Sequence, residues 1–254
     1  MAASRARGGG PPQSLPLATE DGTRFPRGKG NVADRLFYFL GALWLTVALL
    51  VCSLILGLAL GLILASARLS RHAPLRLAAT AYIEVLRGVP LLVTLLLMAF
   101  ALPGLLRDFG QIPTFWLAVF AFGMCYAAYM AEVFRAGIES VDVGQREAAR
   151  ALGLSGRQTL WHIVLPQALR NVLPAFVNQA VALLKDTSLA AVIGIEEITQ
   201  RARLEVAATY DTFAVYIMVA VIYLVLTLSL SQLARALERR QARARPDHPS
   251  PRAA

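Results

Sequence analysis

Uncharged apolar runs long enough to cross a membrane constrain this chain more than any other feature. No residue between Arg35 and Arg68 carries a charge, and Thr212 to Ala234 is a second run of this kind. A helix needs about 20 apolar residues to cross the hydrocarbon core of a bilayer. The 57% share of hydrophobic residues and the mean hydropathy of +0.56 exclude an ordinary soluble domain. The chain is therefore predicted to be an all-α membrane protein.

The apolar segments predict about five transmembrane helices within a single transmembrane domain over residues 36–240. A long polar loop, 135–170, separates the third span from the fourth. Residues 1–35 are rich in Gly, Pro and Arg, and 241–254 are rich in Arg and Pro; both are too poor in apolar residues to form a core. Both segments are therefore expected to be disordered tails. The expected spans are 37–67, 78–106, 112–134, 171–195 and 212–234.

The basic residues lie in loops and tails, which fits membrane topology better than nucleic-acid binding, in spite of the net charge of +9. Five spans place the two ends of the chain on opposite sides. Segments 68–80, 135–171 and the tail from Arg235 hold 14 Lys and Arg residues, against 9 on the other side. Because cytoplasmic loops carry the excess of basic residues, we expect the 135–170 loop and the C-terminus in the cytoplasm. The basic N-terminal tail argues the other way.

The most distinctive polar segment is EAARALGLSGRQTLWHIVLP, from Glu147 to Pro166. Its Ala and Gly residues have almost no side chain, so the groove of a partner protein could close on the helix backbone. Glu147 in the first turn complements the helix dipole, and Pro166 is expected to end the helix. The segment predicts a docking helix; the alternative is an ordinary amphipathic helix between two spans.

Two Glu–Arg pairs with a spacing of three residues lie at expected membrane edges. Glu84 and Arg87 share a helix face and are expected to pair, while Pro90 predicts a kink or a new helix. Glu132 and Arg135 repeat the spacing at the end of the third span. We interpret all four as gate or anchor residues, with simple anchoring of the helix as the alternative. Within the first span, a GxxxG pattern predicts the close approach of another helix.

The fourth apolar segment is interrupted by polar residues. Charges within a span are unfavourable and are functional candidates by default, so we predict a discontinuous or heavily tilted span. If the span is discontinuous, its free helix N-terminus favours a carboxylate. The alternative is that Lys185 and Asp186 only neutralise each other at a helix junction. The candidate substrate-binding residues are Asn178, Lys185, Asp186, Thr187 and Ser188.

In combination, these motifs resemble the permeases of binding-protein-dependent ABC importers of the polar amino-acid type, over about Ala42 to Arg240. The matching motifs are E-A-A with Gly153 and I-x-L-P in the loop, E-x-x-R-G-x-P at Glu84, and K-D-T-S-L at Lys185. Val89 and Ala136 depart from the residues that are usual in this subfamily. The resemblance implies the type I ABC importer architecture with a cytoplasmic EAA coupling loop. The residues it assigns to coupling with the ATPase are Glu147, Ala148, Ala149, Gly153, Ile163, Leu165 and Pro166.

The same resemblance implies a multi-pass protein of the bacterial cytoplasmic (inner) membrane that imports an amino acid. Its implied partners are ABC ATPase subunits, a second permease subunit in a homodimer or heterodimer, an extracytoplasmic solute-binding protein and the lipid bilayer, with no nucleic acid. The chain has no GxxxxGK[ST] motif, and its only lysines are Lys29 and Lys185. We therefore expect no catalytic residues and no cofactor of its own, with ATP bound by the partner.

Other functions stay open on the sequence alone. The cargo could be an opine or a small sulfur compound. An ion-driven secondary transporter would explain charges within the membrane but not the docking helix, and a non-transporting scaffold would leave the interrupted span unexplained. His72, His162 and His248 lack the spacing of metal ligands, so no metal site is expected. Cys52 and Cys125 fall in apolar runs and are expected to pack as small hydrophobic residues.

Overall fold

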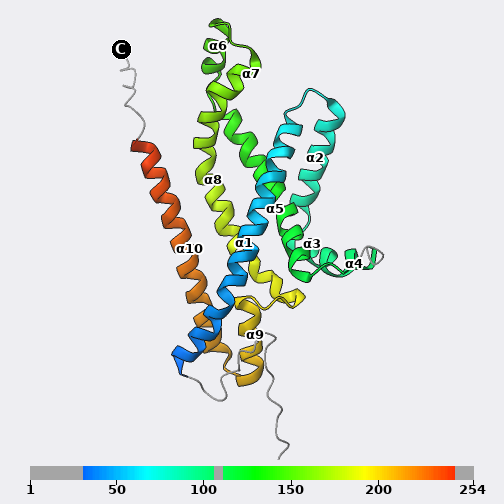
Figure 1. Cartoon of the computed structure of the whole chain (residues 1–254), viewed down its shortest axis with the longest axis vertical. Helices are drawn as coiled ribbons and strands as arrows, with labels where there is room; N and C mark the ends of the chain where they lie inside the picture. Colours follow the sequence, from blue (N-terminus) through cyan, green and yellow to red (C-terminus); the bar gives the residue numbers. More distant parts are fainter. Residues whose placement is uncertain (1–30, 106–110, 244–254) are drawn as a thin grey trace, which may run out of the picture.

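The computed structural model describes residues 31–105 and 111–243, and every regular element in these ranges is helical (Figure 1). Helix α1 (Val32–Arg68) begins three residues before the expected tail boundary, so the end of that tail is helical. Helix α10 (Thr212–Arg243) likewise continues through 241–243. The rest of both predicted tails, 1–30 and 244–254, lies outside the described residues.

Four described helices are long and apolar enough to cross a membrane, and a bent pair raises the number to five. The bent pair is α2 (Ala73–Gly88) and α3 (Leu91–Leu96), which continues through a π-helical turn at Leu97–Ala101 into α4 (Leu102–Leu105). The two arms meet at 102°. The kink or new helix expected at Pro90 within the predicted span 78–106 is therefore confirmed. The residue before a proline is driven out of the helical region, and Val89 is indeed extended, with φ −91° and ψ 133°.

Helix α5 (Thr114–Glu139) lies at the centre of the bundle and packs against α1, α2, α3 and α8. The GxxxG pattern of α1 faces it. A Cβ added at Gly61 would lie 2.6 Å from the Cβ of Met130, so only glycine lets the two backbones come this close. The predicted close helix approach is thus confirmed, and it occurs within the chain.

The fourth span is one long helix rather than an interrupted one. It runs from Gly156 to Ile193 through α7 (Gly156–Thr159), a π-helical turn (Leu160–Val164), α8 (Leu165–Asp186) and a 3₁₀ segment (Thr187–Ile193). Pro166 does not end the helix, because it lies in the first turn of α8, directly after the π turn, where its missing N–H is tolerated. Where a break was expected near Lys185, the helix continues and only changes from α to 3₁₀ geometry. The predicted discontinuous span is therefore wrong.

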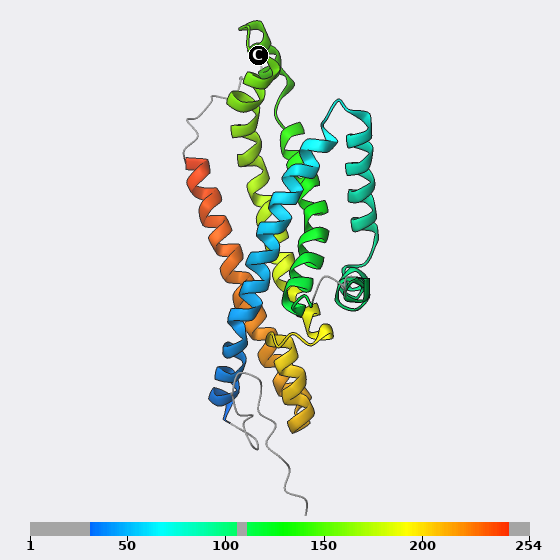
Figure 2. The same ribbon diagram turned by 45° about the vertical axis from the view of Figure 1, so that its right-hand side comes forward.

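Figures 1 and 2 show how the two ends of the bundle differ. Helix α6 (Val143–Ala151) and α7 project from one end, toward which the last described turns of α10 also point. Helix α9 (Ile198–Thr209) and the start of α1 lie at the other end. The start of α1 and the end of α10 are thus on opposite sides, as the predicted topology requires.

Candidate functional site

Asp186 is held at the middle of the bundle by a tyrosine. The hydroxyl of Tyr126 donates a 2.7 Å hydrogen bond to Oδ2 of Asp186. Tyr126 is buried and lies at the midpoint of the 26-residue helix α5, so the carboxylate of Asp186 lies level with the centre of that span. An isolated carboxylate there would be strongly unfavourable. The tyrosine hydroxyl, which sequence reasoning missed, is the partner that stabilises it.

The remaining substrate candidates are distributed around this point. Lys185 and Asn178 are exposed and Ser188 is half-buried, whereas Thr187 is buried and its hydroxyl donates a 2.7 Å hydrogen bond to the carbonyl of Leu184. Among the described residues, Lys185 forms no ion pair with Asp186. The expected mutual neutralisation of the two charges is therefore not what stabilises this junction.

The free helix N-terminus expected at Lys185–Ser188 is also wrong. A helix C-terminus, that of α8, lies there. The next N-terminus belongs to α9, and the carboxylate of Glu197 already caps it by accepting hydrogen bonds of 2.9 Å from the N–H groups of Thr199 and Gln200. Any carboxylate bound near Asp186 must therefore be held by side chains.

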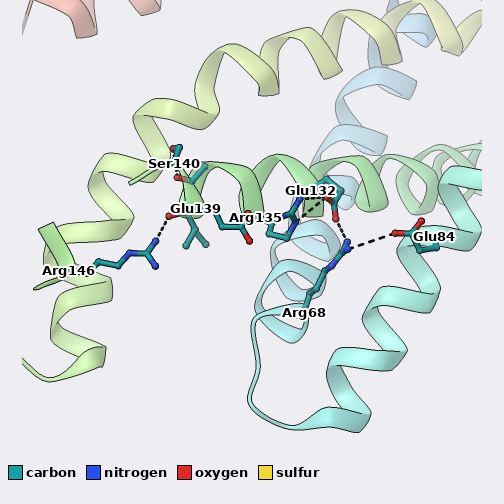
Figure 3. Close-up of polar contacts among 9 residues, drawn as sticks. Arg68, Glu84, Glu132, Arg135, Glu139, Ser140 and Arg146 are labelled. Carbon is teal, nitrogen blue, oxygen red and sulfur yellow. Dashed lines mark hydrogen bonds and ion pairs between the residues drawn. The ribbon is translucent and has the colours of Figure 1, made fainter. Parts of the chain in front are cut away.

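A second polar cluster connects α1, α2 and α5 (Figure 3). Arg68 at the end of α1 pairs with Glu132, and its Nη2 lies 3.9 Å from Oε1 of Glu84. Nη2 of Arg135 lies 2.9 Å from Oε2 of Glu132, which confirms the pairing expected from their spacing. The expected Glu84–Arg87 pair is wrong, because Glu84 pairs with Arg68 instead. The guanidinium of Arg87 lies over the ring of Tyr129, 5.8 Å from its centroid.

A cavity of about 500 Å³ adjoins this cluster, between α2, α5 and α8. The residues that line it are Arg87, Tyr129, Glu132, Val133, Arg135, Ala136, Gly137, Ser140, Asn171, Val172, Ala175 and Gln179. It lies nearer than Asp186 to the projecting helices α6 (Val143–Ala151) and α7, since α5 runs from Tyr126 through Glu132 toward α6.

The projecting segment, α6 with α7, is shaped by capping interactions. The Asp142 side chain accepts a 2.7 Å hydrogen bond from the N–H of Gly144 at the start of α6, and Ser155 with Gln158 forms a capping box at α7. Gly153 has φ +80°, a left-handed conformation that favours glycine, and a Cβ added there would meet nothing within 4 Å. Its role within this chain is thus to permit the turn between the two helices.

The predicted coupling residues are not equally accessible. Glu147, Ala148, Gly153 and Pro166 are exposed, while Ile163 and Leu165 are half-buried. Ala149 is only 3% exposed, which leaves it little surface for a partner. Two large apolar side chains that sequence reasoning missed are open instead: Leu152 is 81% exposed and Trp161 is 58% exposed.

A third polar cluster, also missed, lies at the opposite end of the molecule. Within the segment that the sequence presents as a mixed-charge loop, Glu197, Arg201 and Glu205 are buried. Arg35 reaches them from α1: its Nη1 lies 2.7 Å from Oδ2 of Asp211, and its Nε lies 3.5 Å from Oε1 of Glu205. Burial raises the pKa of the carboxyls of Glu197 and Glu205, neither of which lies in a span. The regular spacing of these residues along α9 was the signal in the sequence that could have revealed this cluster.

These features define a class of protein: a multi-pass membrane subunit with polar groups at the centre of its bundle and an exposed two-helix projection for a partner. The model of the family described as binding-protein-dependent transport system inner membrane component matches residues 57–243. The chain belongs to this family.

Relatives of known role cover most of the chain. The arginine transport system permease protein ArtQ of Bacillus subtilis is 39% identical over 203 residues, which are 80% of this chain and 92% of ArtQ. The glutamine transport system permease protein GlnP of Escherichia coli is 39% identical over 199 residues, 78% of this chain and 88% of GlnP. A solved structure described as an amino acid ABC transporter with histidines superposes with a TM-score of 0.77 at 39% identity, covering 82% of this chain and 96% of that one.

Proposed function

We propose that this chain is the permease subunit of an ABC importer that carries polar amino acids across the bacterial cytoplasmic membrane. The observation that carries the proposal is the combination, in one chain, of a hydrogen-bonded carboxylate at mid-span, Asp186, and an exposed projection, α6–α7, at the coupling end. The likeness to arginine and glutamine permeases supports the cargo class. ATP is hydrolysed by a partner subunit.

The site around Asp186 suits a zwitterion. An amino acid presents an ammonium group and a carboxylate, and both need partners inside a bilayer. In the proposed arrangement, the carboxylate of Asp186 receives the ammonium, and Lys185 and Asn178, both exposed on α8, receive the carboxylate. Ser188 stays a candidate contact. Thr187 is buried with its hydroxyl engaged, so its role is to shape the 3₁₀ segment.

The proposed assembly contains two permease subunits, two ATPase subunits and an extracytoplasmic solute-binding protein. The projection fits this role because large apolar side chains on it or next to it are open, among them Leu152 and Trp161, and are suited to a groove on another protein. The segment is joined to the bundle through Val141, Val164 and Ala168, which form a small core at the ends of α5 and α8. Movement imposed on the projection would therefore reach the spans that carry Tyr126 and Asp186.

The test is purification of the tagged chain from membranes of its own host, followed by identification of what co-purifies. The expected companion is an ATPase with a Walker A motif, and the reconstituted complex should hydrolyse ATP faster when a loaded solute-binding protein is added. Uptake into proteoliposomes is then measured for arginine, histidine, glutamine, cystine and octopine. Recovery of the chain without an ATPase would overturn the proposal, and uptake of octopine alone would overturn the cargo class.

A further inference from the structure

The cavity beside Arg87 is lined by more polar side chains than helix anchoring requires. It is large enough for a small ligand. Three charged side chains line it: Arg87, Glu132 and Arg135. Side-chain amides come from Asn171 and Gln179 on α8, and an aromatic face comes from Tyr129. Ala136, Gly137 and Ala175 leave the interior free of bulk.

The charges of two of these residues are already compensated. Glu132 pairs with Arg68 and Arg135, and Arg135 also pairs with Glu139. Arg87, by contrast, is exposed and has no ion pair within the described part of the chain. Its guanidinium lies over the ring of Tyr129 and interacts only at longer range with the carboxylate of Glu132, which Arg68 and Arg135 already pair. The cavity thus offers a guanidinium with no ion pair of its own, and guanidinium groups bind carboxylates with a bidentate geometry.

Helix α8 connects this cavity to Asp186. Residues seven apart lie on nearly the same helix face, and α8 carries polar residues at that spacing in two rows, Asn171–Asn178–Lys185 and Gln179–Asp186. From Asn171 to Asp186 the rise is about 22 Å at 1.5 Å per residue. Polar side chains along a span are unfavourable against lipid, so their repetition on one side of α8 indicates a face that lines a path.

We propose that this cavity is a second station for the transported molecule, on the coupling side of Asp186, and that Arg87 holds its α-carboxylate there. The inference rests on the proposed function as an amino-acid permease and adds a separate binding site to it. The amides of Asn171 and Gln179 supply further hydrogen bonds to the cargo. Tyr129, whose ring already faces a cation, accommodates the ammonium or the side chain of the cargo.

The test is protection of Arg87 from phenylglyoxal, a reagent for arginine side chains, in the detergent-purified complex with its ATPase. Modification is followed by mass spectrometry of the peptide that contains Arg87. Arg76, exposed on the same helix and outside the cavity, is the internal control. L-Glutamine and L-histidine, each at about ten times its dissociation constant, should slow the modification of Arg87 about tenfold, because only unoccupied sites react. The corresponding amides, which lack the carboxylate, and acetate should have no effect, and Arg76 should react at the same rate throughout.

Three results would overturn the proposal. Modification of Arg87 at the same rate with and without amino acid would show no site. Equal protection by acetate would show a general anion site rather than a station for cargo. An Arg87 that is inert before any addition would show that another chain fills the cavity in the assembled complex.

Two variants separate this inference from the proposed function. In Asp186→Asn, protection of Arg87 should persist, because the two stations are distinct; loss of protection would mean a single site and would overturn the second station. Arg87→Gln should lower the maximal uptake rate about tenfold at normal membrane expression, whereas Arg76→Gln should not change it. If no amino acid is imported but Arg87 is protected, the proposed function fails while the carboxylate site stands.

Discussion

The hydroxyl of Tyr126 on α5 donates a 2.7 Å hydrogen bond to the carboxylate of Asp186 at the end of α8, and this contact joins the two helices at mid-span. A mid-span carboxylate with one neutral donor keeps acceptor capacity for a further partner. This is the property that a site for an ammonium group requires.

The first prediction concerns this contact. Tyr126→Phe removes one hydrogen bond to a charged group, worth about 1.5–3 kcal/mol, and keeps the packing of the ring. We expect normal expression and uptake with an apparent affinity lowered at least several-fold. The matched control is Tyr216→Phe, at an exposed tyrosine on α10 that lies outside both proposed sites. Unchanged affinity in Tyr126→Phe would show that the contact only supports the fold.

The paired replacement Lys185→Met with Asp186→Leu should abolish uptake while the protein is still expressed.

The second prediction separates two roles of Gly153. Its φ of +80° is unfavourable for a residue with a Cβ by about 1–2 kcal/mol, although Asn tolerates it. Gly153→Val should therefore weaken coupling between ATP hydrolysis and uptake. Gly153→Asn should retain coupling if Gly153 serves only to form the turn. It should lose coupling if the ATPase approaches the backbone closely, because within this chain nothing lies within 4 Å of a Cβ added at this position. ATPase activity and uptake are measured on the same proteoliposomes. Wild-type coupling in both variants would remove Gly153 from the coupling surface.

The third prediction concerns the shared carboxylate in Figure 3. The carboxylate of Glu132 compensates the positive charges of Arg68 on α1 and Arg135 on α5. Glu132→Gln therefore leaves Arg68 with only the 3.9 Å contact to Glu84. We expect a loss of about 1–3 kcal/mol of stability, read as a lower melting temperature of the detergent-solubilised protein. Glu139→Gln, at a more exposed carboxylate that also pairs with Arg135, is the control and should change little. Equal effects of the two changes would contradict a central role for Glu132.

The fourth prediction is a pH dependence from the α9 end. Burial raises the pKa of Glu205 above its ordinary 4.5; Arg35 opposes this shift, and Asp211 reinforces it. A raised pKa in the folded state means that the contribution to stability is complete below the unfolded value and is lost as the pH rises through the folded value. Glu205→Gln should therefore remove part of the destabilisation that the wild type shows as the pH rises above the ordinary value of 4.5. Each kcal/mol corresponds to about 2–4 °C in melting temperature.

The measurement is the melting temperature of wild type and Glu205→Gln across that pH range, with Glu196→Gln as the control on the adjoining turn. The melting temperature of the wild type minus that of Glu205→Gln should be largest at the lowest pH. A parallel pair of curves would mean that Glu205 titrates in the folded state as it does in the unfolded chain.

The sequence by itself determined the class of fold, because the length of an apolar run decides whether a helix crosses a bilayer and requires no knowledge of its neighbours. It also determined the kink at Pro90, the close packing at Gly61 and the Glu132–Arg135 pair, since these follow from one residue or from the helical repeat. The family resemblance rested on the same local motifs, and the comparisons confirm it.

The tertiary structure alone decided which residues meet across the bundle. Tyr126 and Asp186 are 60 residues apart, and Arg68 and Glu132 are 64 apart; no local pattern specifies which partner a charge will find. For the same reason the nearby pair expected at Glu84–Arg87 is wrong, and the described residues show no ion pair between Lys185 and Asp186, the alternative considered at that junction. A charge in a low-dielectric interior is stabilised by whichever opposite charge or hydroxyl the packing brings close, and here packing on the central helix α5 brought distant partners.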